Sequence, residues 1–141
     1  MERRLNTPLN DVLPDRLTFT RQPRSIAVHP VCSLRRMGLE PKLEALARAC
    51  AETVTVPDAV HCCGWAGDKG FTTPELNAHA LRFLQDGLPA GCTDGFSSSR
   101  TCEIGLSEYA QRPYQSILYL VDSRCAASAG AQGGERTQAS A

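Results

Sequence analysis

The fold is decided by a short apolar run with an abrupt stop, Ser25-Ile26-Ala27-Val28-His29-Pro30. An apolar run of strand length that closes at a proline predicts a buried strand over residues 25–28. Pro41 then suits the first turn of a helix. Behind it, apolar residues recur with helical spacing on one face, at Leu43, Leu46, Ala47 and Cys50. A second strand is expected over residues 53–56, so the order is strand, helix, strand.

The same alternation continues toward the carboxyl end. Thr72 or Thr73 can cap a helix that ends near Gly87, with an apolar stripe at Leu76, Ala80, Leu84 and Leu88. We expect a weak third strand over residues 91–97, a short helix over 103–110 and a clear strand over 116–121. Strands that alternate with helices predict βαβ units, and hence a small three-layer α/β domain with a parallel sheet of three or four strands.

Both ends of the chain differ in composition from this domain. Residues 1–24 contain several prolines and no sustained period, which predicts an arm or linker; a helical turn near residues 10–15 and contacts from Leu17 and Phe19 are expected. Residues 125–141 are rich in small residues and predict a disordered tail. The domain is therefore expected over residues 25–124.

Size, charge and cysteine content narrow the class of protein. A chain of 141 residues with 42% hydrophobic residues suits one globular domain. Its 15 basic and 15 acidic residues give no reason to expect nucleic acid as a partner. We expect no membrane span and no signal peptide, and therefore the cytoplasm. Thiols stay reduced there, so seven cysteines favour metal binding or redox chemistry over disulfides.

The positions of the cysteines point to one edge of the sheet. In an open parallel sheet, the loops at the carboxyl ends of the strands converge. Four cysteines are expected at such ends and are predicted to ligate a metal centre: Cys32, Cys62, Cys63 and Cys102. Cys92, at the start of the weak strand, is an additional candidate ligand. Cys50 is expected in the core, and Cys125 is expected to have no site function.

The adjacent pair Cys62-Cys63 favours a cluster over a single ion. Neighbouring side chains in extended backbone point to opposite sides, so they can straddle a cluster of several atoms. The loop that follows can supply backbone N–H groups to cluster sulfurs, through Gly64, Trp65 and Gly67. Zinc remains an alternative, although the paired Cys-x-x-Cys spacing usual for zinc is absent from the sequence. His29 and His61 are either ligands or surrounding residues of such a site, or simply flank it.

Three segments resemble the cysteine-rich CCG domain: His29-Pro30-Val31-Cys32-Ser33, His61-Cys62-Cys63-Gly64-Trp65-Ala66-Gly67 and Ser99-Arg100-Thr101-Cys102-Glu103-Ile104-Gly105. Such domains occur in heterodisulfide reductase B subunits, in the iron–sulfur subunit of glycolate oxidase and at the carboxyl end of FAD-dependent D-lactate dehydrogenases. The resemblance extends over about residues 17–121. It implies that Cys32, Cys62, Cys63 and Cys102 bind an iron–sulfur cluster.

One departure from the family pattern affects the kind of cluster. Ser99 stands where the family has the first cysteine of a final Cys-x-x-Cys, so a [4Fe–4S] cluster is expected, with Cys92 as a substitute ligand. His29 and Ser99 join Gly64, Trp65 and Gly67 in the predicted shell around the cluster. The resemblance implies an electron-transfer module, not itself catalytic, of a 2-hydroxyacid dehydrogenase of the D-lactate type that passes electrons to a quinone or cytochrome. Its FAD would lie in a partner with a ferredoxin-like part, with peripheral association at the inner membrane.

Two alternatives remain at this point. One is a zinc or thiol domain that serves structure or interaction, and it predicts folding that depends on zinc. The other is a subunit that reduces disulfides itself, in the manner of heterodisulfide reductase.

Overall fold

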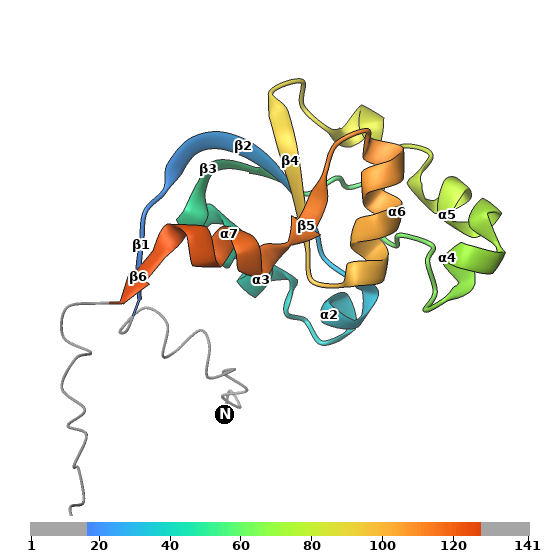
Figure 1. Cartoon of the computed structure of the whole chain (residues 1–141), viewed down its shortest axis with the longest axis horizontal. Helices are drawn as coiled ribbons and strands as arrows, with labels where there is room; N and C mark the ends of the chain where they lie inside the picture. Colours follow the sequence, from blue (N-terminus) through green and yellow to red (C-terminus); the bar gives the residue numbers. More distant parts are fainter. Residues whose placement is uncertain (1–16, 128–141) are drawn as a thin grey trace, which may run out of the picture.

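A parallel sheet of four strands forms the centre of the computed structural model, which describes residues 17–127 (Figure 1). Its order is β3-β2-β4-β5, and all neighbouring strands run parallel. The bounds are Gln22–His29 for β2, Ala51–Thr55 for β3, Cys92–Ser97 for β4 and Tyr114–Ser116 for β5. The predicted α/β class is confirmed, and the strands expected near residues 25, 53 and 91 are present.

Helices cover both faces of this sheet. The helices are α2 (Cys32–Arg36), α3 (Glu40–Cys50), α4 (Lys69–Thr72), α5 (Pro74–Leu81), α6 (Arg100–Ala110) and α7 (Ile117–Arg124), with a 3-10 turn, η1, over Gln85–Gly87. Alternate residues of β2 enter different cores: Ile26 and Val28 pack with α3 and α7, whereas Ala27 packs with α5 and α6. The domain therefore has the three layers predicted from its sequence.

The strand predicted over residues 116–121 is wrong. β5 covers Tyr114–Ser116, and the apolar residues that follow form α7. Ile117 and Leu120 are buried while Leu118 and Tyr119 are exposed, which is helical spacing on one face. The hydroxyl of Ser116 accepts a hydrogen bond from the Leu118 N–H and caps this helix.

The single helix predicted from Thr72 or Thr73 to about Gly87 is instead divided into shorter elements. α4 ends at Thr72, and α5 begins at Pro74 with Thr73 at its N-cap position. Leu76, placed on the apolar stripe by its spacing, is 47% exposed. The buried stripe instead begins one residue later and consists of Asn77, Leu81, Leu84 and Leu88.

Regular structure extends past the predicted domain boundaries at both ends. β1 (Leu17–Phe19) pairs antiparallel with β6 (Cys125–Ala127), in a separate two-stranded sheet. Phe19 packs against the α3 and α7 core, as its sequence context predicted. β2 likewise begins at Gln22, inside the expected arm. The helical turn predicted near residues 10–15 and the tail after residue 127 lie outside the described residues.

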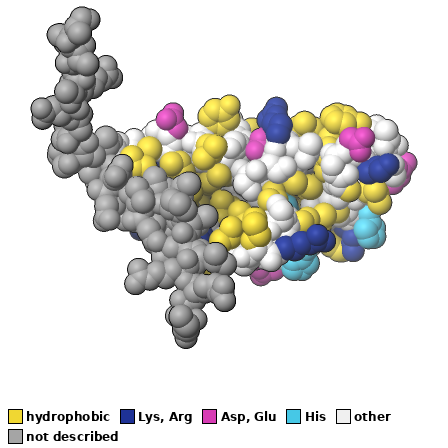
Figure 2. Space-filling model, turned by 90° about the horizontal axis from the view of Figure 1, so that it is seen from below, with side chains coloured by type: hydrophobic (Ala, Val, Ile, Leu, Met, Phe, Trp, Pro, Cys, Tyr) yellow, Lys and Arg dark blue, Asp and Glu magenta, His cyan; other side chains and the backbone are white. Residues whose placement is uncertain are grey.

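The surface carries charges of both signs. Basic and acidic side chains are scattered among hydrophobic ones on the face shown in Figure 2, in keeping with the balanced charge of the chain. Among the residues that the structure describes, no helix has the length and apolar character needed to cross a bilayer.

Replacing Gly95 with alanine is expected to destabilise the fold by about 1–3 kcal/mol, the usual cost of overpacking a core. A Cβ atom on Gly95 would lie 2.4 Å from the ring of Tyr114, and that ring is only 2% exposed. Gly91→Ala is the matched control, because no described atom lies within 4 Å of its added Cβ. Urea unfolding measures both variants; equal stability of the two would contradict the packing described.

Candidate metal centre

Three chain segments meet at the carboxyl edge of the sheet. β2 ends at His29, and Cys32 opens α2 three residues later. The loop after β3 carries Cys62 and Cys63. Beyond β4, Cys102 lies in the first turn of α6. The convergence predicted from the order of strands and helices therefore brings the four cysteines together.

A hollow of about 320 Å³ opens between these segments. Its lining includes all four predicted thiols together with Trp65, Gly67 and Ser99. Exposure is graded across it, because Cys63 and Cys102 are buried, Cys32 is partly buried and Cys62 is exposed. The hollow thus has a sulfur-lined floor and an accessible rim.

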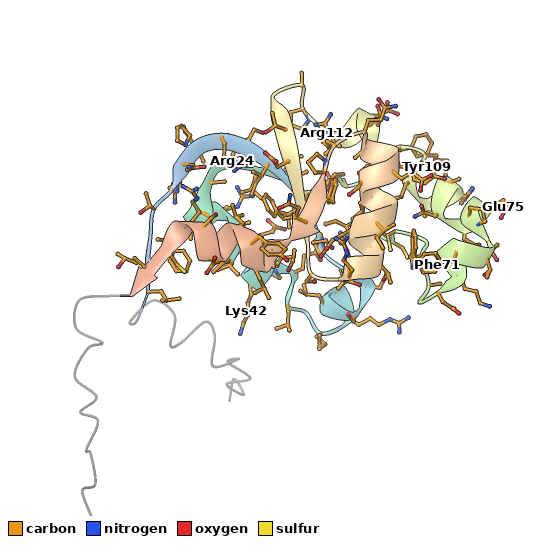
Figure 3. The ribbon with its side chains drawn as sticks, viewed as in Figure 1. Arg24, Lys42, Phe71, Glu75, Tyr109 and Arg112 are labelled. Carbon is orange, nitrogen blue, oxygen red and sulfur yellow. The ribbon has the colours of Figure 1, made fainter. Side chains whose placement is uncertain are left out.

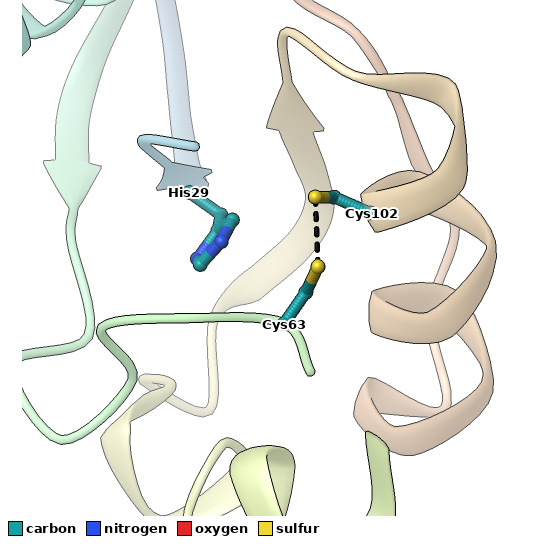
Figure 4. Close-up of side chains that lie close together, drawn as sticks. All are labelled: His29, Cys63 and Cys102. Carbon is teal, nitrogen blue, oxygen red and sulfur yellow. Dashed lines mark hydrogen bonds between the residues drawn. The ribbon is translucent and has the colours of Figure 1, made fainter. Parts of the chain in front are cut away.

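The sulfur atoms lie in two close pairs. The Sγ atoms of Cys63 and Cys102 are 2.8 Å apart and share a hydrogen bond (Figure 4). Cys32 and Cys62 form the second pair, and Cys32 also interacts electrostatically with Cys63 and Cys102. Thiols this close to each other compete for protons and suit a positively charged metal.

Proton affinity differs between the thiols. The hydrogen bond with Cys102 lowers the pKa of Cys63 to about 7, and backbone N–H groups assist. The same bond, together with burial, raises the pKa of Cys102. Burial and the contact with Cys62 raise the pKa of Cys32. Near pH 7, Cys63 is therefore the thiol of this buried pair that is more readily ionised, and Cys102 retains the proton.

His29 faces the buried sulfur pair from the end of β2 (Figure 4). Its side chain and the sulfurs of Cys63 and Cys102 place their ligand atoms within 4.8 Å of one another. Burial, with a further contribution from the charge of Arg35, lowers the pKa of His29 to about 4. The imidazole is therefore neutral at pH 7, the form that binds metals.

A loop in left-handed backbone conformation carries Cys62 and Cys63 past the hollow. Positive φ angles occur at Gly64 (72°), Ala66 (47°) and Gly67 (78°). Gly64 also passes close to α5, since a Cβ there would lie 2.4 Å from the carbonyl oxygen of Leu76. The Gly64 N–H points to the Cys62 sulfur at 3.4 Å. This loop therefore supplies a backbone donor to the sulfur of Cys62.

Ser99 and Trp65 complete the side of the hollow next to α6. The hydroxyl of Ser99 lies 3.2 Å from that of Thr101, and Ser99 lines the same hollow as Cys102. Trp65 is 4% exposed, and its ring lies against Gly70 and Gly105, where an added Cβ would clash with it. Both residues therefore lie where the sequence placed them, beside the thiols.

Searches of protein-family models, curated proteins and solved structures find no match for this chain.

Cys92 lies apart from this group. It starts β4, whereas the site lies beyond the other end of that strand, next to Ser97. Its carbonyl oxygen accepts a hydrogen bond from Arg112, which is labelled in Figure 3. A strand of this length spans about 17 Å, so the structure does not bring Cys92 to the other thiols. It was a candidate because Ser99 stands where the resembling family has a cysteine, and its predicted place at the start of the strand already put it at the opposite edge of the sheet.

The other cysteines and histidines lie outside the buried sulfur group, and Cys50 lies in the core as predicted. Cys50 is fully buried in the core formed with α3. Cys125 lies in β6, paired with Phe19. His61, which precedes Cys62, and His79 are both exposed. Of the three histidines, only His29 joins the buried sulfur group.

Asn77 is a part of the site that the sequence analysis missed. It is 2% exposed on α5, and its side-chain N–H donates to the carbonyl oxygen of Cys63. Helix α6 passes close by at Gly105, where a Cβ would lie 2.5 Å from the Asn77 amide. The spacing of residues 77, 81, 84 and 88 is also helical, but an asparagine does not mark a buried face by its hydrophobicity.

Replacing Asn77 with alanine is expected to lower stability by about 1–3 kcal/mol, because a buried carbonyl group loses its donor. Metal affinity is expected to fall about 10–100-fold, as is usual when a residue that orients a ligand is lost. Leu76→Ala on the same helix is the control, since that side chain is 47% exposed. Thermal unfolding and metal competition measure the two effects; an Asn77 variant indistinguishable from the Leu76 variant would contradict them.

The donor set fits a thiophilic metal. Thiolates and a neutral imidazole are the ligands of zinc and of iron–sulfur centres. His29, Cys63 and Cys102 alone could hold one metal ion, and Cys32 and Cys62 lie at the rim of the same hollow. The site is therefore suited to metal binding.

Proposed function

We propose that this chain binds an iron–sulfur cluster of the [4Fe–4S] type and transfers electrons. The observation that carries the proposal is the gathering of Cys32, Cys62, Cys63 and Cys102 around one hollow at the carboxyl edge of the sheet. These residues come from three separate segments, and core packing alone does not require sulfur at each position. Cys62 in particular is exposed, where a cysteine with a packing function is uncommon.

The residues around the hollow would have different roles in such a site. Cys32, Cys62, Cys63 and Cys102 would supply the thiolates, while the Gly64 N–H would hydrogen-bond to sulfur and tune the centre. Trp65 shields the inner side from water. When bound, the cluster supplies one-electron transfer, which none of these side chains provides.

The proposed setting is a larger dehydrogenase. The resemblance to CCG domains favours a module of an FAD-dependent 2-hydroxyacid dehydrogenase of the D-lactate type, connected to a quinone or cytochrome acceptor. Its partner would carry the flavin and a ferredoxin-like part, in the cytoplasm or peripherally at the inner membrane. The exposed rim at Cys62 supports this proposal, because it leaves a short path from the thiols to a docked partner.

A mononuclear zinc site is the second candidate. It is favoured by the compactness of the sulfur group, because Cys63 and Cys102 lie 2.8 Å apart. Two thiolates on one tetrahedral zinc lie about 3.7 Å apart, and the sulfurs that hold a cluster of several irons are more widely spaced. In that case, metal would stabilise the fold and carry no electrons.

Anaerobic purification followed by metal analysis separates the two candidates. The proposal expects iron and acid-labile sulfide in about equal amounts, near four of each per chain, and a visible absorption that dithionite bleaches. The same analysis is repeated after reconstitution with Fe²⁺ and sulfide, because a cluster can be lost during purification. A colourless protein that holds one zinc per chain and takes up no iron on reconstitution would overturn the proposal and support the zinc site.

A further inference from the structure

We propose that His29 is a direct nitrogen ligand of the metal bound at this edge, so that the centre has mixed nitrogen and sulfur ligation. The inference rests on the proposed metal-binding function of the site, but not on which metal the site holds. A [4Fe–4S] cluster takes one protein ligand per iron, so His29 would stand in place of one of the four thiolates of the all-cysteine set. This assignment also goes beyond a place for His29 in the surrounding shell.

The first observation is an unpaired nitrogen. His29 is 1% exposed, and within the described part of the chain its Nε2 atom has no hydrogen-bond partner. Leaving a buried polar atom unpaired costs about 1–3 kcal/mol, and such atoms are rare in folded proteins. A residue that only filled the core behind the sulfurs would serve better as an apolar side chain.

The second observation is the distance to sulfur. The ligand atoms of His29, Cys63 and Cys102 all lie within 4.8 Å of one another. Nitrogen and sulfur ligands on one tetrahedral ion lie about 3.5 Å apart, given metal–nitrogen and metal–sulfur bonds of about 2.0 and 2.3 Å. Side-chain rotations that move these nitrogen and sulfur atoms by about an ångström would therefore bring all three into coordination with one metal ion.

The third observation is that the backbone holds these ligands independently of a metal. His29 ends the central strand β2, and its carbonyl oxygen accepts a hydrogen bond of 3.0 Å from Ser97 on β4. The carbonyl oxygen of Cys63 is fixed in turn by Asn77. Cys102 lies within the first turn of α6. Ligands that rigid elements hold in this way make precise metal sites.

Histidine labelling tests the proposal without altering His29. The chain has three histidines, so the variant His61→Ala with His79→Ala keeps His29 as its only histidine. Both replaced residues are exposed, so the fold is expected to persist. With ¹⁵N-histidine incorporated, pulsed EPR of the reduced, reconstituted cluster is expected to show nitrogen coupling of the strength of direct coordination, which the unlabelled protein shows as ¹⁴N.

A second arm uses Cd²⁺ in place of iron and sulfide. The iron-free protein, loaded with ¹¹³Cd²⁺ alone, is expected to give an NMR signal split by the ¹⁵N of His29. His29→Ala is expected to weaken Cd²⁺ binding by about 100-fold or more, beyond what loss of an orienting residue costs, while His61→Ala leaves it unchanged. His29→Cys, which restores a donor, is expected to recover binding and to give no nitrogen coupling.

The two arms distinguish this inference from the proposed function. Failure of reconstitution combined with a ¹⁵N-split cadmium signal would end the iron–sulfur proposal and leave the nitrogen ligand standing. A reconstituted cluster with no strong histidine coupling, together with an unsplit cadmium signal, would overturn the inference and leave the cluster. If His29→Ala does not fold, the labelled double variant and His29→Cys still decide the question.

Discussion

Replacing Cys63 or Cys102 with serine is expected to abolish metal loading of this chain. The two sulfurs form the buried floor of the hollow and lie 2.8 Å apart. A hydroxyl does not ionise near pH 7 and binds soft metals poorly. The expected loss of affinity exceeds the roughly 100-fold that follows from disturbing a residue behind the ligands. Metal content per chain and competition with a chelator measure it.

Matched cysteines elsewhere in the fold provide the controls. Cys125→Ser changes a thiol in β6, and Cys50→Ala changes one on the far face of the sheet. Both variants are expected to load metal normally, although loss of the fully buried Cys50 side chain will cost some stability. Cys62→Ser is expected to have a smaller effect than Cys63→Ser because Cys62 lies at the exposed rim. Equal metal content in all five serine and alanine variants would rule out this hollow as the binding site.

Replacing Trp65 with alanine is expected to destabilise the protein by about 3–5 kcal/mol, the usual cost of removing a large aromatic side chain from a core. Trp65 is 4% exposed and belongs to the core cluster that also contains Leu81, Leu84 and Leu106. Its ring also meets Phe71 edge-on, with centroids 5.1 Å apart. Because domains are stable by about 5–15 kcal/mol, this single change removes a large share of the total.

Two other aromatic changes sharpen that test. Phe83→Ala removes a ring that is 48% exposed and is expected to cost far less. Trp65→Phe keeps most of the packing and is expected to retain most of the stability. Urea unfolding followed by circular dichroism compares all three variants, since Trp65 is the sole tryptophan and its fluorescence is lost with it. A Trp65→Ala variant no less stable than Phe83→Ala would show that the loop does not depend on this ring.

The sequence predicted the secondary structure best where the pattern of apolar residues fitted only one kind of element. The run before His29 predicted the second half of β2, and the stripe of Leu43, Ala47 and Cys50 predicted nearly all of α3. Residues 116–121 were harder, because six residues rich in strand formers carry no clear period. The Ser116 cap and the burial of Ile117 and Leu120 make this segment a helix. Both features depend on the residue at which β5 ends.

The site shows a similar limit. Positions at the ends of strands predicted correctly that Cys32, Cys62, Cys63 and Cys102 would meet, because topology alone brings such ends together. The same rule argued against Cys92, because its predicted place at the start of β4 lies at the opposite edge of the sheet. Asn77 required knowledge of which helical face turns inward toward Cys63, and this depends on packing between helices.

The order of strands in the sheet also governs how this protein is completed on the ribosome. β2 lies between β3 and β4 in the sheet, and Ile26 pairs with Asp94. The central strand β2 can therefore complete its pairing only after β4 has been synthesised. Pairings so distant along the chain form slowly. Cys32, Cys62 and Cys63 emerge first, whereas Cys102 follows only with α6. Three of the four thiols of the site are therefore synthesised before the fourth, and protection from oxidants matters most in that interval.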